Sequence, residues 1–138
     1  MSILRAVGAT VAAFIAGNVG IMSGQTLNQV FFPMPEGLKP EDAAGFAAWV
    51  AGLPIAALLG VELSYVFGSL LAGFVGAVVS PAHAKLIAGV SGVLFTLANV
   101  ANIMAIPHPT WMVILTMITF LPLTFAGAAI GARVRPGA

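Results

Sequence analysis

The chain contains no cysteine and very little charge. Because there is no thiol, the protein cannot form a disulfide framework, a thiolate metal site, a cysteine nucleophile or an iron–sulfur cluster. Charged residues make up 7% of the 138 residues and hydrophobic residues make up 60%, which is far from the composition of a soluble domain. We therefore interpret residues 1–138 as one transmembrane domain of an all-α integral membrane protein.

The scarcity of charge also argues against nucleic acid as a partner. Five basic and four acidic residues leave a net charge of +1. They cannot form the basic face that binds a phosphate backbone. The expected partners are instead the lipid bilayer, further copies of the chain and other membrane proteins.

Motifs of known catalytic sites are missing as well. The sequence has no glycine-rich phosphate loop with its lysine, no His-x-x-x-His pair, and no second acid beside Glu62 in the apolar segments. His83 and His108 are expected on opposite sides of the membrane, so they cannot share one haem or metal ion within a monomer. We expect no catalytic residue, no metal site and no cofactor.

Proline-rich segments divide the apolar sequence into four membrane crossings. Phe32-Pro33-Met34-Pro35 must end the first helix, because proline lacks a backbone donor and disfavours helical geometry at the residue before it. Leu86 to Ala132 is a run of 47 residues without Lys, Arg, Asp or Glu, which is too long for one crossing. Ile106-Pro107-His108-Pro109 divides it. We predict a four-helix bundle with crossings at about residues 4–30, 54–80, 82–105 and 110–132.

Two details qualify these crossings. The apolar run that follows Arg5 resembles a secretory signal, but we expect it to be retained as the first crossing. Pro122 lies inside the fourth crossing and is expected to kink it.

Residues 41–53 predict a short interfacial helix before the second crossing. Lys39-Pro40-Glu41-Asp42 resembles a helix start, with proline in the first turn and acids at the positive end of the helix dipole. Apolar residues follow at helical spacing, but about a dozen residues cannot cross a bilayer. The alternative is that this segment simply continues into the second crossing.

Small residues at four-residue spacing predict where the helices pack. Residues i and i+4 share one helix face, and small side chains let membrane helices approach closely. The alternative is that membrane helices are generally rich in glycine and alanine. The predicted packing residues are Gly8, Ala12, Ala16, Gly20, Gly24, Gly68, Ala72, Gly76, Gly127 and Gly131.

The few charges predict the orientation of the chain. With four crossings, Arg5, Lys85, Arg133 and Arg135 all fall on one side, which the positive-inside rule assigns to the cytoplasm. We therefore expect a multi-pass protein of the bacterial inner membrane with both termini in the cytoplasm. Trp49, Trp111 and His108 are expected at the outer interface, where aromatic belts form.

The polar residues of the crossings are expected mainly in the outer half of the bundle, at about 1.5 Å of rise per residue. They predict an outward-facing polar cleft with Glu62 at its floor. The residues assigned to this cleft are Asn18, Gln25, Asn28, Glu62, Ser64, Asn99, Asn102, Thr116 and Thr119.

Glu62 has three interpretations, because a carboxyl group in hydrocarbon must be neutral, partnered or hydrated. It can be a protonated structural group bonded to an amide such as Asn18 or Asn99. It can be a carboxylate that handles protons or cations in a hydrated cavity. It can also contact a partner protein or lipid.

A weak internal repeat appears when the chain is shifted by 74 residues. Asn28 to Pro35 then falls on Asn102 to Pro109, and the Pro-x-Pro pairs coincide. The repeat predicts two related helical hairpins, an arrangement known in transporters. The alternative is coincidence, because prolines are common in loops.

Four short elements carry a resemblance to known proteins. They are Pro33-Met-Pro-Glu-Gly37, Leu53-Pro-Ile-Ala56, the Gly68 to Gly76 strip and, most specifically, Ile106-Pro-His-Pro-Thr-Trp111. From about residue 28 onward the chain resembles a family of small four-helix bacterial inner-membrane proteins of uncharacterised function. The resemblance implies the four-helix topology and supplies no activity. Family members carry Glu and His just before the proline-rich loop, where this chain has Gln25 and Asn28.

Two functional hypotheses follow from the sequence. The first is a structural or accessory membrane protein that acts through helix association, as a homo-oligomer or as a small subunit of a larger membrane complex. The alternative is a small channel, or a carrier coupled to protons or cations, that uses the polar cleft around Glu62.

Overall fold

The computed structural model describes residues 2–135, and within this range the chain is helical without β-strands. Four helices are long and apolar enough to cross a membrane: α1 (Ser2–Phe31), α3 (Ile55–Val79), α4 (Ala84–Ala105), which follows the 3₁₀ turn η1 (Pro81–His83), and α5 (Thr110–Arg133). The remaining helix, α2 (Ala43–Ala51), has nine residues and is too short to span. The predicted fold class, four apolar helices packed in an all-α protein, is confirmed. Residues 1 and 136–138 of the predicted domain lie outside the described residues.

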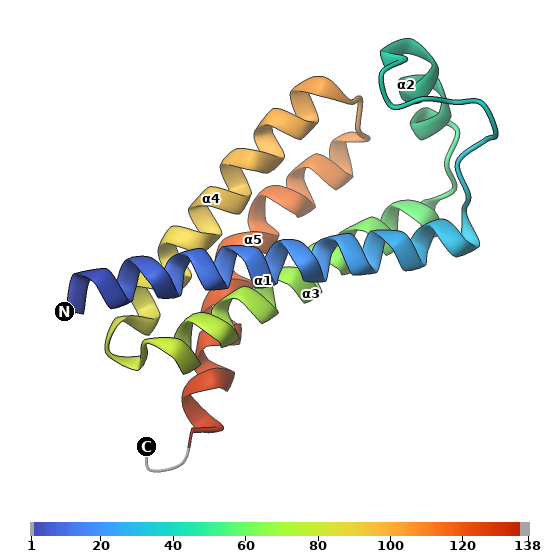
Figure 1. The fold of residues 1–138 in the computed structure, drawn as a ribbon. Coiled ribbons are helices and arrows are strands. Elements are labelled where there is room, and N and C mark those ends of the chain that lie inside the picture. Colours follow the sequence, from blue (N-terminus) through green and yellow to red (C-terminus); the bar gives the residue numbers. More distant parts are fainter. Residues whose placement is uncertain (1, 136–138) are drawn as a thin grey trace.

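The long helices alternate in direction, so both ends of the described chain lie at the opposite end of the bundle from α2 (Figure 1). We call these the terminal end and the loop end. At the terminal end, Arg5 donates from Nε and Nη2 to the Val79 carbonyl oxygen at 3.2 and 3.1 Å. This contact ties the start of α1 to the end of α3. Toward the loop end the α1–α3 pair and the α4–α5 pair diverge, and α2 lies beside the opening (Figure 1).

α3 is the central helix and packs along α1 on one side and along α5 on the other. Both contacts depend on glycine. A side chain at Gly68 would collide with Ile21 and with the α1 backbone, and a side chain at Gly73 or Gly127 would collide with the facing backbone across the α3–α5 contact. Membrane helices pack in this way because missing side chains let the backbones approach. Gly68, Ala72, Gly76, Gly127 and Gly131 are all buried.

The face of α1 that packs on α3 differs from the strict four-residue strip expected from the sequence. Gly20 and Gly24 do lie against α3, but Gly8 is exposed and has no heavy atom within 4 Å of the position of a Cβ. Ala12 and Ala16 are only half-buried. Four residues advance the helix by about 40° more than a full turn, so a strict strip rotates away from its neighbour. The buried residues combine spacings of three and four: Ala6, Ala9, Ala13, Gly17 and Gly20.

α2 is a separate helix that begins two residues after the expected start at residue 41. The Asp42 carboxylate accepts a hydrogen bond from the Gly45 N–H at 3.0 Å, which is the N-cap arrangement. Pro54 then adopts extended geometry and caps the start of α3. The proline therefore interrupts the helix, because it can neither donate nor hold the residue before it in helical geometry.

In the second half of the chain, prolines lie both between helices and inside one. Pro107 and Pro109 lie in the short connection between α4 and α5, as the sequence predicts. Pro122 lies inside α5 without ending it, and the two halves of α5 run in different directions (Figure 1).

Candidate functional site

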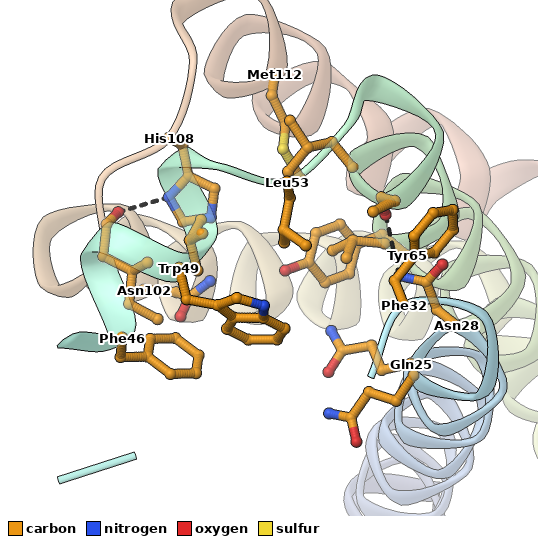
Figure 2. A pocket seen from close by; sticks show the side chains of 16 residues that line it. Gln25, Asn28, Phe32, Phe46, Trp49, Leu53, Tyr65, Asn102, His108 and Met112 are labelled. Carbon is orange, nitrogen blue, oxygen red and sulfur yellow. Dashed lines mark hydrogen bonds between the residues drawn. The ribbon is translucent and has the colours of Figure 1, made fainter. Parts of the chain in front are cut away.

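A pocket of about 180 Å³ lies at the loop end, enclosed by α1, α2, α3, α4 and the start of α5 (Figure 2). None of its lining residues is an Asp, Glu, Lys or Arg. Its polar lining consists of Gln25, Asn28, Gln29, Tyr65, Asn102 and His108. Its aromatic and apolar lining consists of Phe32, Phe46, Trp49, Val50, Leu53, Ala57, Leu58, Val61, Ile106 and Met112. A pocket of this volume suits a small solute.

The lining is held in place by local contacts. α2 places the rings of Phe46 and Trp49 edge to face, with centroids 5.4 Å apart, on the side of the pocket opposite Gln25 and Asn28 (Figure 2). The Asn28 Nδ2 group donates to the Ala57 carbonyl oxygen at 3.0 Å. This bond fixes the end of α1 against the start of α3.

His108 presents a defined edge of its ring to the pocket. Its Nδ1 lies 2.6 Å from the Ile106 carbonyl oxygen. A carbonyl oxygen can only accept, so Nδ1 carries the proton in this contact. In a neutral imidazole the other nitrogen, Nε2, is then an acceptor, which leaves it available to an N–H or O–H donor.

Glu62 lies behind the pocket, in the contact between α3 and α5. Its side chain is 5% exposed. The Thr116 hydroxyl lies 2.9 Å from Oε2, and the Thr119 hydroxyl is hydrogen-bonded to Oε1. Both threonines lie on α5, one turn apart, so each is hydrogen-bonded to a different oxygen of the same carboxyl group.

Each threonine also has a second acceptor within reach. Thr116 Oγ1 lies 2.6 Å from the Met112 carbonyl oxygen, and Thr119 Oγ1 lies 2.7 Å from the Leu115 carbonyl oxygen. A hydroxyl has one proton and cannot donate to both neighbours. A threonine that donates to its own helix must therefore accept from the carboxyl group, and this requires a protonated Glu62.

No basic residue lies in the middle of a membrane-spanning helix, where it could balance a carboxylate. The five basic residues are at helix ends or in loops: Arg5, Lys39, Lys85, Arg133 and Arg135. Burying an unpaired carboxylate in a membrane is costly.

Tyr65 connects the pocket with Glu62. It is the pocket-lining residue of α3 that lies furthest from the loop end, and it is buried. Its ring packs against Phe120 with centroids 5.3 Å apart, and it lies three residues after Glu62 on α3. Tyr65 rather than Glu62 therefore forms the floor of the pocket.

The residues assigned to the polar cleft fall into separate groups. Gln25, Asn28 and Asn102 line the pocket, whereas Glu62, Thr116 and Thr119 form the buried cluster. Asn18 donates to the Phe14 carbonyl oxygen of its own helix at 2.9 Å, and Ser64 donates to the Val61 carbonyl oxygen at 2.5 Å. Asn99 is buried, and its Nδ2 has no hydrogen-bond partner among residues 2–135.

The aromatic residues expected at the outer interface also differ in role. Trp49 and His108 line the pocket, whereas Trp111 does not and is exposed at the start of α5. Gln29 and Tyr65 were not singled out from the sequence. Tyr65 could have been found, because it is the only tyrosine of the chain and lies one helical turn from Glu62.

Comparison with protein-family models, curated proteins and solved structures finds no match. Among residues 2–135, no three His, Cys, Asp or Glu side chains lie together in a group that could hold a metal ion. The two histidines lie at opposite ends of the bundle, since His83 is in η1 and His108 is in the connection between α4 and α5. The groups that can bind or react at this site are therefore those of the pocket lining and the buried carboxyl group.

Proposed function

We propose that the chain is a multi-pass protein of the bacterial inner membrane with both termini in the cytoplasm. Arg5, Lys85 and Arg133 lie at the terminal end, and by the positive-inside rule this end faces the cytoplasm. The three acids of the first loop, together with Trp49 and Trp111, lie at the loop end. The resemblance to small four-helix inner-membrane proteins belongs to the same proposal.

We propose further that the protein is a proton-coupled carrier of a small cation. The observation that carries this proposal is the position of Glu62: a buried carboxyl group without a basic partner, separated from the pocket by Tyr65. A carboxyl group in this setting can be neutral in two ways. It can hold a proton, or it can face a cation.

The pocket lining supports a small organic cation as the solute. The faces of Trp49, Phe46 and Phe32 can attract an ammonium group with or without N–H groups, and the amide oxygens of Gln25 and Asn102 can accept N–H groups from a solute that has them. A positive charge in the pocket and a proton on Glu62 then oppose each other electrostatically. Binding of the cation releases the proton as a free hydronium ion, and protonation releases the cation, which is the coupling that an exchanger needs.

Flux measurements on reconstituted protein test this proposal. Purified protein in liposomes should take up tetramethylammonium in response to a proton gradient directed out of the liposome. Glu62→Gln should abolish the response to the gradient while leaving the fold intact. Thr110→Ser, at the exposed start of α5, is the matched control and should behave like the wild type. If Glu62→Gln leaves the pH-dependent flux unchanged, the carrier proposal is wrong.

A structural or accessory role is the second candidate, favoured by one observation on α1. Gly8 has no neighbour within 4 Å and Ala12 and Ala16 are half-exposed, so a strip of small residues on α1 is left uncovered by this chain. Such a strip suits another membrane helix. Extraction in mild detergent should then yield an oligomer or a co-purifying membrane protein, which Gly8→Leu should disrupt and Glu62→Gln should not. A monomer without partners would exclude this role.

A further inference from the structure

Four aromatic rings, one from each membrane-spanning helix, form a continuous layer beneath the pocket. Phe14 of α1 stacks on Phe95 of α4 with ring centroids 4.9 Å apart, and Phe95 stacks on Phe120 of α5 at 5.7 Å. Tyr65 of α3 packs against Phe120 at 5.3 Å. Tyr65, Phe95 and Phe120 each lie ten residues from the loop end of their helix, a depth of about 15 Å. The layer closes the bundle at the floor of the pocket, which Tyr65 forms.

Two buried polar atoms flank this layer without a partner. Within residues 2–135, the buried side-chain nitrogen and oxygen atoms that make no hydrogen bond are Asn99 Nδ2 and Ser91 Oγ. Asn99 lies four residues from Phe95 toward the loop end, and Ser91 lies four residues from Phe95 toward the terminal end. Both therefore lie on the buried face of α4 that carries Phe95. Asn99 is 6% exposed and Ser91 is 0% exposed.

Buried polar groups in proteins are nearly always hydrogen-bonded, to the protein or to water. Water at such sites supplies the missing partner. Asn99 and Ser91 thus mark two positions suited to water, one on each side of the ring layer.

On the terminal side of the rings, three fully buried hydroxyl groups occupy matching positions along three helices. Ser69, Ser91 and Thr124 each lie fourteen residues from the loop end of α3, α4 and α5, and each is 0% exposed. Ser69 Oγ donates to the Tyr65 carbonyl oxygen at 2.7 Å, and Thr124 Oγ1 donates to the Leu121 carbonyl oxygen at 2.9 Å. Their protons are used, but their oxygen lone pairs remain free to accept.

We propose that Ser69, Ser91 and Thr124 form a second site, which binds water carrying a proton. The layer of Phe14, Tyr65, Phe95 and Phe120 is the barrier between this site and Glu62. This inference deepens the proposed function, because it gives the proton of Glu62 a route to the terminal end. When the rings separate, the Glu62 O–H bond breaks and its proton passes to a water beside Asn99. It then moves through the ring layer to a water held by the three hydroxyls, and no further reactant is consumed.

Proton conductance in liposomes tests the barrier. With a membrane potential set by potassium and valinomycin, the wild type should conduct protons slowly. Phe95→Ala should raise the conductance by about tenfold or more, because removing the ring lowers the energy barrier to proton passage. Phe95→Leu, which keeps most of the volume, is the matched control and should raise it less. The increase should be lost when Glu62→Gln or Ser91→Ala is added to Phe95→Ala.

The absence of cysteine provides a second measurement that does not depend on transport. Single substitutions Asn99→Cys and Ser91→Cys are tested with a small thiol reagent added to the full chain in liposomes. Asn99→Cys should react from the loop side. Ser91→Cys should stay unreactive from that side unless Phe95→Ala is also present, and Val90→Cys, on the exposed face of α4, is the control for lipid-facing sites.

The outcomes separate the two proposals. If Phe95→Ala changes neither the conductance nor the reactivity of Ser91→Cys, the barrier is wrong even where wild-type cation flux depends on Glu62. If the conductance rises but Ser91→Ala leaves it high, the second site is wrong. If the conductance and reactivity follow the expected pattern in a protein without cation flux, the water route stands and the carrier proposal fails.

Discussion

At the scale of single residues, the Glu62 carboxyl group is held by two hydroxyls that each have another acceptor on their own helix. Such a network can shift its protons without moving heavy atoms. Each hydroxyl can donate either to Glu62 or to a carbonyl oxygen of its own helix.

The two threonines should matter for stability because they satisfy a buried carboxyl group. Thr116→Val and Thr119→Val keep the shape of the side chain and remove its hydroxyl. Each should lower the free energy of unfolding by about 1–2 kcal/mol, the usual cost of a lost buried hydrogen bond. Thr110→Val, at the exposed start of α5, should change it little. Thermal unfolding in detergent measures the difference, and equal midpoints for all three variants would contradict the network.

At the scale of the elements, the positions of the helices follow directly from the sequence, whereas their contact faces do not. Proline pairs and apolar length fix where each helix begins and ends, because these effects act locally along the chain. The facing residues depend on helix rotation and crossing, which no local pattern records. For this reason the strip at Gly8, Ala12 and Ala16 does not coincide with the buried face, and depth alone grouped Ser64 and Asn18 with Glu62.

The polar cleft illustrates the same limit. Glu62, Asn99 and Thr116 lie at similar distances from the loop ends of their helices. These distances follow from the helical rise alone. Whether Glu62 or Tyr65 faces the pocket depends on about a sixth of a turn of α3, because three residues rotate a helix by about 300°. In the structure the floor of the pocket is formed by Tyr65, which lies three residues after Glu62 on α3.

Two glycines of α1 provide a matched test of its contact face. At Gly17 an added Cβ would lie 2.5 Å from Phe95 Cζ and 3.0 Å from the Gly68 carbonyl oxygen, whereas at Gly8 nothing lies within 4 Å. Gly17→Ala should therefore destabilise the protein by about 1–3 kcal/mol through overpacking. Gly8→Ala should have little effect in the isolated chain. Unfolding midpoints in detergent distinguish them, and the reverse order would show that α1 packs through another face.

At the scale of the whole molecule, the bundle is closed by small residues toward the terminal end and is open and polar toward the loop end. Gly73, Gly127 and Gly131 bring α3 and α5 into backbone contact, while the helix pairs diverge around the pocket near α2 (Figure 1). This asymmetry is compatible with the proposed carrier, whose pocket opens at the loop end. The orientation of the chain therefore determines to which side of the membrane the pocket opens.

The orientation itself can be measured with reporter fusions. A reporter that is active only in the cytoplasm should be active when fused after Arg135 and inactive when inserted at Gly37, in the exposed first loop. The physical reason is the placement of Arg5, Lys85, Arg133 and Arg135 at the terminal end. Activity at Gly37 together with inactivity after Arg135 would reverse the orientation and place the pocket on the cytoplasmic side.

The most direct test of the account is to measure proton release while a cation binds. Tetramethylammonium is titrated into the purified protein in weakly buffered detergent solution, and the pH is followed with an indicator dye. We expect the number of protons released by the wild type to rise with the cation concentration and then level off as the pocket fills. Glu62→Gln should bind the cation without releasing protons. Binding to the wild type without proton release, or the same release from Glu62→Gln, would contradict the coupling between the pocket and Glu62.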